Sequence, residues 1–216
     1  MSHALVLVTA PTSDPVAVAD VKNYLRIDTS VDDAMLTSFI SAATRVIEKY
    51  LNRRLITQTW DFYMDRFPAA IFNDALMSSD GVTTGRLSEF LSQKKFIEIP
   101  YFPLQSVTYL KTFDDSNNEY TMSSSDYYVD QVSEPGRLSL KNDTTWPTTF
   151  LLPTNGVVIR FVCGYGDESA VPFELKQAIM ELVGKFYMNR GCDESENSIP
   201  PSALMLLNSY RVYRMG

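Results

Sequence analysis

The chain has 216 residues, 45% of them hydrophobic, and a net charge of −7 from 19 basic and 26 acidic side chains. This length favours one domain, or one domain with a sizeable elaboration. The acidic balance argues against a surface that neutralises nucleic-acid phosphates, which needs clustered Lys and Arg. It is compatible with a protein that lets DNA pass, because an acidic wall repels the phosphates.

Cysteine usage and hydropathy indicate the compartment. Cys163 and Cys192 are too few for a disulfide scaffold and lack the spacing of metal ligands, so we expect free thiols. The N-terminal MSHALVLVTAPTSDP has neither the basic flank nor the long apolar centre of a secretory signal. No apolar run reaches membrane-spanning length. We therefore expect a soluble protein made in a reducing cytoplasm, with no membrane partner.

Apolar periodicity predicts two helices between Pro15 and Asn52. The stretch VADVKNYLRI places apolar residues at helical spacing. We predict that the second helix begins at Ser30, a capping residue, with Asp33 as a weak capping-box partner. The apolar face of this helix comprises Leu36, Phe39, Ile40, Ala43, Ile47, Tyr50 and Leu51. A helix with such an apolar face needs a packing partner, and the preceding helix is the nearest candidate along the chain.

From Leu55 the apolar period changes to two, which predicts strands. ITQTWDFYMDRF alternates as a half-buried strand does, and strand-like runs recur at 96–100, 106–113, 119–122, 127–132, 137–141 and 157–165. Turn clusters such as DDSNN and SEPG separate them, which predicts an antiparallel meander or small barrel. The polar residues 69–95 form an unusually long connection.

The stretch GYGDESAVPFELKQAIMELVGKFYMNRG, residues 164–191, could hold a phosphate or could simply end a strand. It lacks the glycine spacing and the Lys-Ser/Thr pair of a phosphate loop. Asp167 and Glu168 would repel an anion. We therefore predict that Gly164 and Gly166 free the backbone to leave the sheet, and that Pro172 occupies the first turn of a helix. A short terminal helix is expected after SIPPSALMLL.

Nothing in the sequence indicates an enzyme, a metal site or a cofactor site. His3 is the only histidine, so a Ser-His-Asp or Cys-His catalyst is not expected. Asp32 and Asp33 are adjacent on a helix and point about 100° apart, so they share no site. DDSNNE, residues 114–119, lacks the glycine and distal Glu of a calcium loop and is predicted to be a hairpin turn.

In combination these motifs resemble the head–tail connector (adaptor) proteins of tailed bacteriophages and gene transfer agents, in the subgroup with an inserted β-domain. The resemblance spans nearly the whole chain. It depends on VADVKNYLRID, on the join NRRLITQTW, on IEIPYFPLQSV, on GYGDESAVPFELKQAIMELVGKFYMNRG and on IPPSALMLLNSYRV. The length of the 69–95 segment departs from this pattern.

The resemblance implies an α+β fold with a helical connector core. The expected parts are N-terminal helices in 1–54, an inserted β-domain in 55–166, and C-terminal helices with a portal-directed tail in 167–216. It implies a ring, usually of twelve copies, in the virion at the head–tail junction, assembled in the bacterial cytoplasm. The implied partners are the portal protein, a neck or tail-completion protein, and genomic DNA that slides through the lumen without specific binding.

Two sets of residues are candidates for these contacts. The C-terminal segment combines Arg and Tyr as interface anchors do, although it could equally pack on its own helices. Its portal-interface candidates are Leu206, Leu207, Tyr210, Arg211, Tyr213 and Arg214. Candidates for the ring interface, which needs two complementary patches per subunit, are Arg45, Lys49, Glu174 and Glu181. For any single one of these four, an ordinary solvated helix surface is the simpler interpretation.

Two functions of other classes stay open at this stage. A carbohydrate-binding module of a tail would show exposed aromatic residues in a groove of the β-domain. A hydrolase would need a pair of carboxylates brought together by folding. Neither explains why the helical ends carry so much of the recognisable pattern.

Overall fold

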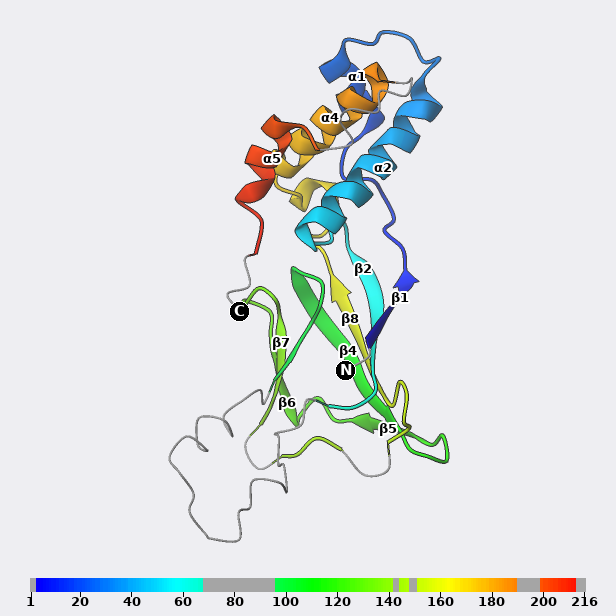
Figure 1. The fold of residues 1–216 in the computed structure, drawn as a ribbon, viewed down its shortest axis with the longest axis vertical. Coiled ribbons are helices and arrows are strands. Elements are labelled where there is room, and N and C mark those ends of the chain that lie inside the picture. The colour runs from blue at the N-terminus through cyan, green and yellow to red at the C-terminus, as the bar shows by residue number, and fades with distance from the viewer. Residues whose placement is uncertain (1–2, 68–95, 142–143, 148–150, 190–198, 213–216) are drawn as a thin grey trace. The chain divides into compact units, whose positions relative to one another are not determined.

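The computed structural model describes residues 3–67, 96–141, 144–147, 151–189 and 199–212 (Figure 1). The predicted 69–95 connection and Cys192 lie outside the described residues. The chain divides into two compact units. The β-unit comprises residues 1–8, 59–100 and 104–162, and the helical unit comprises 9–58, 101–103 and 163–216. This division confirms an α+β fold in which strands separate the N-terminal from the C-terminal helices.

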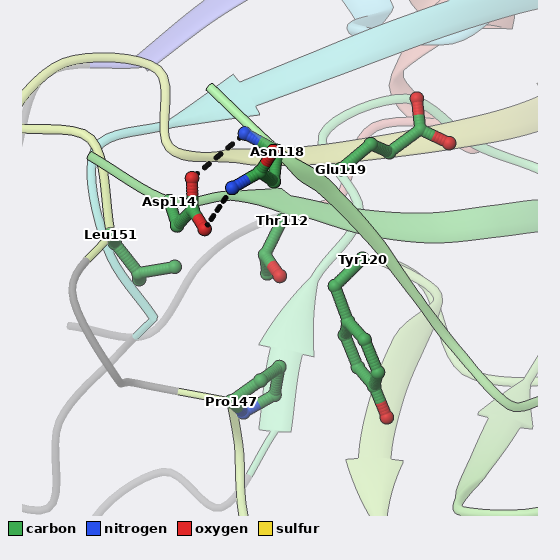
Figure 2. A pocket seen from close by; sticks show the side chains of 7 residues that line it. All are labelled: Thr112, Asp114, Asn118, Glu119, Tyr120, Pro147 and Leu151. Carbon is green, nitrogen blue, oxygen red and sulfur yellow. Dashed lines mark hydrogen bonds between the residues drawn. The ribbon is translucent and has the colours of Figure 1, made fainter. Parts of the chain in front are cut away.

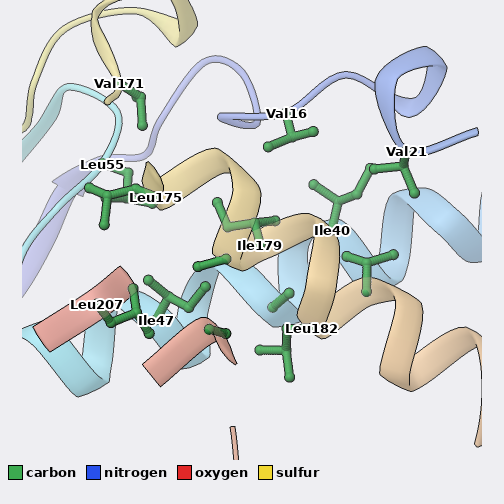
Figure 3. Packing of buried hydrophobic residues seen from close by; sticks show 14 of the residues in the cluster. Val16, Val21, Ile40, Ile47, Leu55, Val171, Leu175, Ile179, Leu182 and Leu207 are labelled. Carbon is green, nitrogen blue, oxygen red and sulfur yellow. The ribbon is translucent and has the colours of Figure 1, made fainter. Parts of the chain in front are cut away.

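Four α-helices in the described part of the helical unit pack around one apolar core, shown in Figure 3. They are α1 (Val18–Leu25), α2 (Asp33–Leu51), α4 (Phe173–Met188) and α5 (Pro201–Asn208). Helix α4 contacts the other three, and α2 also contacts α1. The predicted apolar faces supply the core, since the side chains of Leu36, Ile40, Ile47, Leu175 and Ile179 are at most 1% exposed.

The start of α2 differs from the prediction. Asp32 occupies the capping position and α2 begins at Asp33. Ser30 contributes its backbone carbonyl, which accepts from the Asp33 N–H at 3.3 Å. The Asp33 carboxylate instead binds the Lys22 ammonium of α1 at 2.8 Å. The capping-box prediction at Ser30 was therefore wrong, because the acid of the box pairs with the neighbouring helix.

Gly164 and Gly166 occupy backbone conformations that side chains disfavour, with φ of 123° and 139°. A Cβ at Gly164 would lie 2.5 Å from the carbonyl oxygen of Ile56. The structural role predicted for these glycines is confirmed.

Asp167 caps the 3₁₀ turn η2 (Glu168–Ala170), because its carboxylate accepts from Ser169 N–H and Ala170 N–H. Pro172 is the cap before α4, so the prediction that it lies in the first turn of the helix was wrong.

The described strands form two sheets (Figure 1). One has the order β1-β2-β8-β4-β5 and the other β3-β7-β6. Their bounds are β1 (His3–Thr9), β2 (Gln58–Met64), β3 (Phe96–Glu98), β4 (Leu104–Phe113), β5 (Glu119–Met122), β6 (Tyr127–Asp130), β7 (Arg137–Leu140) and β8 (Val157–Cys163). Every predicted strand is present. Strand β1 was not predicted, and its pairing with β2 makes the large sheet more than a consecutive meander.

One buried charge interrupts the alternation of β2. Asp61 is only 6% exposed, although it is a charged residue of a half-buried strand. Its two carboxylate oxygens accept from Arg160 of β8, each at 2.7 Å. This bidentate pair raises the pKa of Arg160 and keeps the guanidinium charged. The same guanidinium lies 4.9 Å from the ring centroid of Tyr109 on β4.

Residues 114–118 form the predicted hairpin turn between β4 and β5. Asp114 Oδ1 accepts from the N–H groups of Ser116 and Asn118 at 3.0 and 2.7 Å. Asn117 adopts the left-handed conformation with φ of 61°. β4 and β5 then pair antiparallel, with Leu110 opposite Met122 and Phe113 opposite Glu119.

Candidate assembly surfaces

The segment after α5 is fastened to the helical unit by Arg53. This arginine is 5% exposed. Its Nε donates to the carbonyl oxygen of Tyr210 at 2.8 Å, and its Nη1 donates to the Tyr165 hydroxyl at 3.1 Å. The guanidinium also lies 4.7 Å from the ring centroid of Phe102. A cation is favourable at this carbonyl because the C-terminal end of a helix carries partial negative charge.

Tyr210 makes a second attachment in the same segment. Its hydroxyl donates to Glu174 Oε2 at 2.9 Å. The pKa of Glu174 is lowered by its own backbone N–H and by Tyr210, so the carboxylate stays ionised and accepts this bond. Burial and Glu174 raise the pKa of Tyr210, so the phenol keeps its proton. Residues 209–212 therefore have a defined attachment before any partner binds.

Tyr50 of α2 provides a third contact with this segment. Its hydroxyl donates to Asn208 Oδ1 at 3.3 Å. The guanidinium of Arg211 lies 5.3 Å from the Tyr50 ring centroid, within the range of a cation–π interaction. Helix α2 thus holds both the end of α5 and the residue that follows the turn.

The portal-interface candidates divide by burial. Leu207 is fully buried in the core, and Leu206 is half-buried against it. Packing within the helical unit accounts for both leucines, which leaves Tyr210 and Arg211 nearer the surface. Arg211 is exposed. Tyr213 and Arg214 lie outside the described residues, and the contact of this segment with a portal stays a prediction.

The ring-interface candidates divide by charge. Arg45 and Lys49 are exposed one turn apart on α2, on either side of Val46, which is 40% exposed. Glu174 accepts from Tyr210, and Glu181 accepts from the Ser202 hydroxyl at 2.6 Å. The two acids therefore hold the C-terminal segment onto α4, whereas the two bases lie open on α2.

A buried charged cluster at the end of α2 was missed by the sequence analysis. Glu48 Oε1 accepts from Leu55 N–H at 2.8 Å and from Gln58 Nε2 at 3.2 Å. Arg54 Nη1 lies 3.8 Å from Glu48 Oε2, and its guanidinium lies 3.6 Å from the Tyr101 ring centroid. Burial raises the pKa of Glu48 despite these partners. The sequence signal that could have indicated this cluster is Glu48 itself, a charged residue next to Ile47 on the apolar side of the helix.

Figure 2 shows a pocket beside the β4–β5 hairpin. Its volume is about 300 Å³, and Thr112, Asp114, Asn118, Glu119, Tyr120, Pro147 and Leu151 line it. Tyr120 is 57% exposed. Asp114 accepts from Asn118 Nδ2 at 2.9 Å, and the Asn118 bonds lower the pKa of Asp114. Asp114 and Asn118 are therefore bonded to each other within the turn.

The thiol and the histidine occupy structural positions. Cys163 is buried, and burial raises the pKa of its thiol to about 12, which makes it a poor nucleophile. The His3 ring packs edge-on against Phe62 with centroids 6.0 Å apart.

Across the described ranges, no cluster of three or more His, Cys, Asp or Glu side chains could hold a metal ion. Within the same ranges, no helix has the length and hydropathy to cross a membrane.

A family of sequences described as head completion protein matches residues 16–213. The chain belongs to the head completion protein family. This family match extends from the segment before α1 beyond α5, so it includes both units. No curated protein matches the chain significantly.

Solved structures share the fold of this chain, and three of them come from gene transfer agent particles. A chain from the neck of an empty gene transfer agent particle, computed with C6 symmetry, is 21% identical with a TM-score of 0.75. The match covers 98% of this chain and 97% of that one. A chain from the virion of a native gene transfer agent particle is 22% identical with a TM-score of 0.71, over 98% and 96% of the two chains. A chain from the neck of a native particle, computed with C12 symmetry, has 22% identity and a TM-score of 0.70, over 98% and 97%. These findings confirm the head–tail connector resemblance.

Proposed function

We propose that this chain is a structural head–tail connector, located in the virion as a ring between the portal and the tail. The carrying observation is its family membership together with a fold that neck proteins share over almost their whole length. The ring has twelve copies, extends the DNA channel and offers a platform to the next neck or tail-completion protein. Assembly takes place in the bacterial cytoplasm.

The contacts of this ring use different parts of the helical unit. The C-terminal segment faces the portal, with Tyr210 and Arg211 as the described contact residues. Arg45 and Lys49 contribute to the contact between copies, because they are exposed one turn apart on α2. The net charge of −7 suits a lumen through which DNA slides without specific binding.

The geometry favours this role over the two alternatives. Tyr120 supplies an exposed aromatic ring beside a pocket, but Asp114 and Asn118 bond to each other there. Glu48 has the raised pKa of a general acid, yet it faces Leu55 N–H and Gln58 in the interior instead of an open cleft. A structural, non-enzymatic function requires neither site.

Electron microscopy of particles assembled without this gene product tests the proposal. We expect filled or leaking heads separate from free tails, with joining restored when the wild-type chain is supplied. Intact, joined particles that merely fail to infect would contradict a connector function.

Charge reversal at Arg211 tests the portal contact. Because interface arginines often dominate binding, Arg211→Glu is expected to weaken binding to isolated portal rings about tenfold or more. Arg66→Glu, at an exposed position of the β-unit, is the matched control. Equal portal binding by both variants would remove Arg211 from the interface.

A further inference from the structure

We propose that the five-stranded sheet continues from one copy into the next, with β1 of one subunit beside β5 of its neighbour. This inference rests on the ring of the proposed function and names a surface by which copies join. Strands β1 and β5 are the two ends of the sheet order β1-β2-β8-β4-β5 (Figure 1). Each subunit thereby offers two different sheet edges.

Strand β1 has the composition of an interface. Val6, Leu7 and Val8 are 49%, 43% and 41% exposed, although they are consecutive residues of one strand. The strand sequence HALVLVT has no Lys, Asp, Glu or Pro. Natural sheets protect exposed edges with charges, prolines or bulges, because an unprotected apolar edge pairs with other strands. This edge has no charge or proline, which indicates that another strand covers it in the assembled state.

The β5 edge suits β1 as its partner. Glu119, Tyr120 and Thr121 are exposed, and Tyr120 is 57% exposed. Lys111 binds Glu119 at 2.6 Å, so the only charge on β5 is already neutralised within its own subunit. An aromatic residue that packs on an aliphatic one removes apolar surface of both side chains from water. Pairing β5 with β1 would therefore bury apolar surface and leave no charge without a partner.

The symmetry of a closed ring favours a contact between β1 of one copy and β5 of the next. A closed ring requires a heterologous interface, in which two different patches of each subunit meet. A β1–β5 junction is heterologous and repeats from copy to copy. A junction of β1 with β1 is isologous and would end at a dimer. Backbone hydrogen bonds between strand edges make the junction specific in geometry.

The faces of the two strands specify which side chains meet. Asp61 and Tyr109 contact Arg160 on one face of the sheet, so Phe62 and Thr112 lie on the opposite face. His3 packs against Phe62, which places Leu7 on that same face by alternation.

Tyr120 pairs with Thr112 and shares its face, whereas Thr121 pairs with Lys111 and lies on the other. Residues that pair across neighbouring strands lie on the same face. The junction therefore places Leu7 on the same face as Tyr120 of the next copy and on the opposite face from Thr121.

Disulfide cross-linking of the full chain in assembled particles tests this arrangement. The double variant Leu7→Cys with Tyr120→Cys should give, after oxidation, a ladder of covalent multiples on a non-reducing gel. Leu7→Cys with Thr121→Cys places the thiols on opposite faces and should give no ladder, because a disulfide needs Cβ atoms within about 4.5 Å. Leu7→Cys with Tyr128→Cys is a second control, since Tyr128 is 61% exposed on β6 of the other sheet.

Lysines on the edge provide a measurement that needs no cross-link. Val6→Lys with Val8→Lys should leave the melting temperature of the isolated chain unchanged, because both positions are exposed, and should abolish incorporation into the neck. Val132→Lys, at a 94% exposed position of the same unit, should incorporate as the wild type does.

The outcomes separate this inference from the proposed function. A ring in the neck without a ladder, together with normal assembly of the lysine variant, overturns the sheet junction and leaves the connector function standing. Dimers from Leu7→Cys alone overturn it in favour of an isologous contact. Cross-links to another virion protein overturn the choice of occupant. Absence of the chain from the neck overturns both proposals.

Discussion

The two units of the chain differ in how one subunit covers the segment after α5 and the edge strand β1. The helical unit buries charged groups, Glu48 and Arg53, and uses them to fix the end of α2 and the segment after α5. The β-unit leaves apolar side chains exposed along β1. In the helical unit, the segment after α5 is bonded within its own subunit. In the β-unit, the apolar edge strand β1 is left for contact with another copy.

The apolar core of the helical unit should give the largest effect. Ile179→Ala removes a fully buried side chain and is expected to cost about 2–5 kcal/mol of unfolding free energy. Denaturant unfolding followed by circular dichroism at the helical wavelength measures it. Met188→Ala, at a 76% exposed position of the same helix, should change stability by about 0.5 kcal/mol or less. Equal effects would mean that α4 is not held by this core.

Removal of the buried carboxylate is the next test. Glu48→Ala leaves Leu55 N–H, Gln58 and Arg54 without their shared partner, which should cost about 2–4 kcal/mol. Lys49→Ala, one residue on and exposed, should be close to neutral. The same unfolding measurement compares the two. A loss no greater than that of Lys49→Ala would show that water satisfies these donors and that the cluster is not a structural element.

The pH dependence of the same cluster follows from the raised pKa of Glu48. The folded chain holds this proton more tightly than the unfolded chain, whose glutamate has a pKa of 4.5. The contribution of Glu48 to stability therefore falls as pH rises from 4.5 through the raised folded value. Glu48→Gln should remove that dependence, so the stability of wild type relative to this variant should decline over the same range. Parallel pH profiles would contradict it.

The sequence was sufficient where the structural signal is local. The apolar spacing of residues 36–51 and 175–183 predicted two buried helix faces, because a helix repeats every 3.6 residues whatever it packs against. Gly164 and Gly166 were predicted to let the backbone leave the sheet and not to bind a phosphate, because the two acids that follow them would repel an anion. The start of α2 was predicted wrongly because Asp33 pairs with Lys22, a residue of another helix.

The sequence was insufficient where the partner is distant along the chain. Nothing in HALVLVT shows that β1 joins β2, and its apolar residues do not alternate with polar ones. The hydrogen bond from Arg53 to the Tyr210 carbonyl joins residues that lie 157 positions apart in the sequence. The burial of Asp61 is accounted for by its bidentate bonds with Arg160 of β8, a residue 99 positions away. Such pairings depend on topology that periodicity does not encode.

The largest polar effect in the β-unit is expected at Asp61. Asp61→Ala leaves Arg160 without its bidentate partner and should cost about 1–3 kcal/mol, less than a fully buried pair because Arg160 is 31% exposed. Fluorescence can follow this unfolding, since both tryptophans of the chain, Trp60 and Trp146, lie in the β-unit. Asp115→Ala, in the exposed turn, is the control and should be nearly neutral. If Asp61→Ala were as mild, the sheet would not depend on this pair.

The smallest effect on the isolated chain should come from the surface pair of Lys111 and Glu119. These side chains are 25% and 46% exposed, so Lys111→Ala should cost about 0.5 kcal/mol or less, and that loss should vanish in high salt. In the assembled ring the same change has a larger consequence, because it leaves Glu119 uncompensated on the β5 edge. Incorporation into the neck should therefore fall for Lys111→Ala and recover in the double variant with Glu119→Gln. Incorporation that followed chain stability alone would show that β5 does not meet a neighbour.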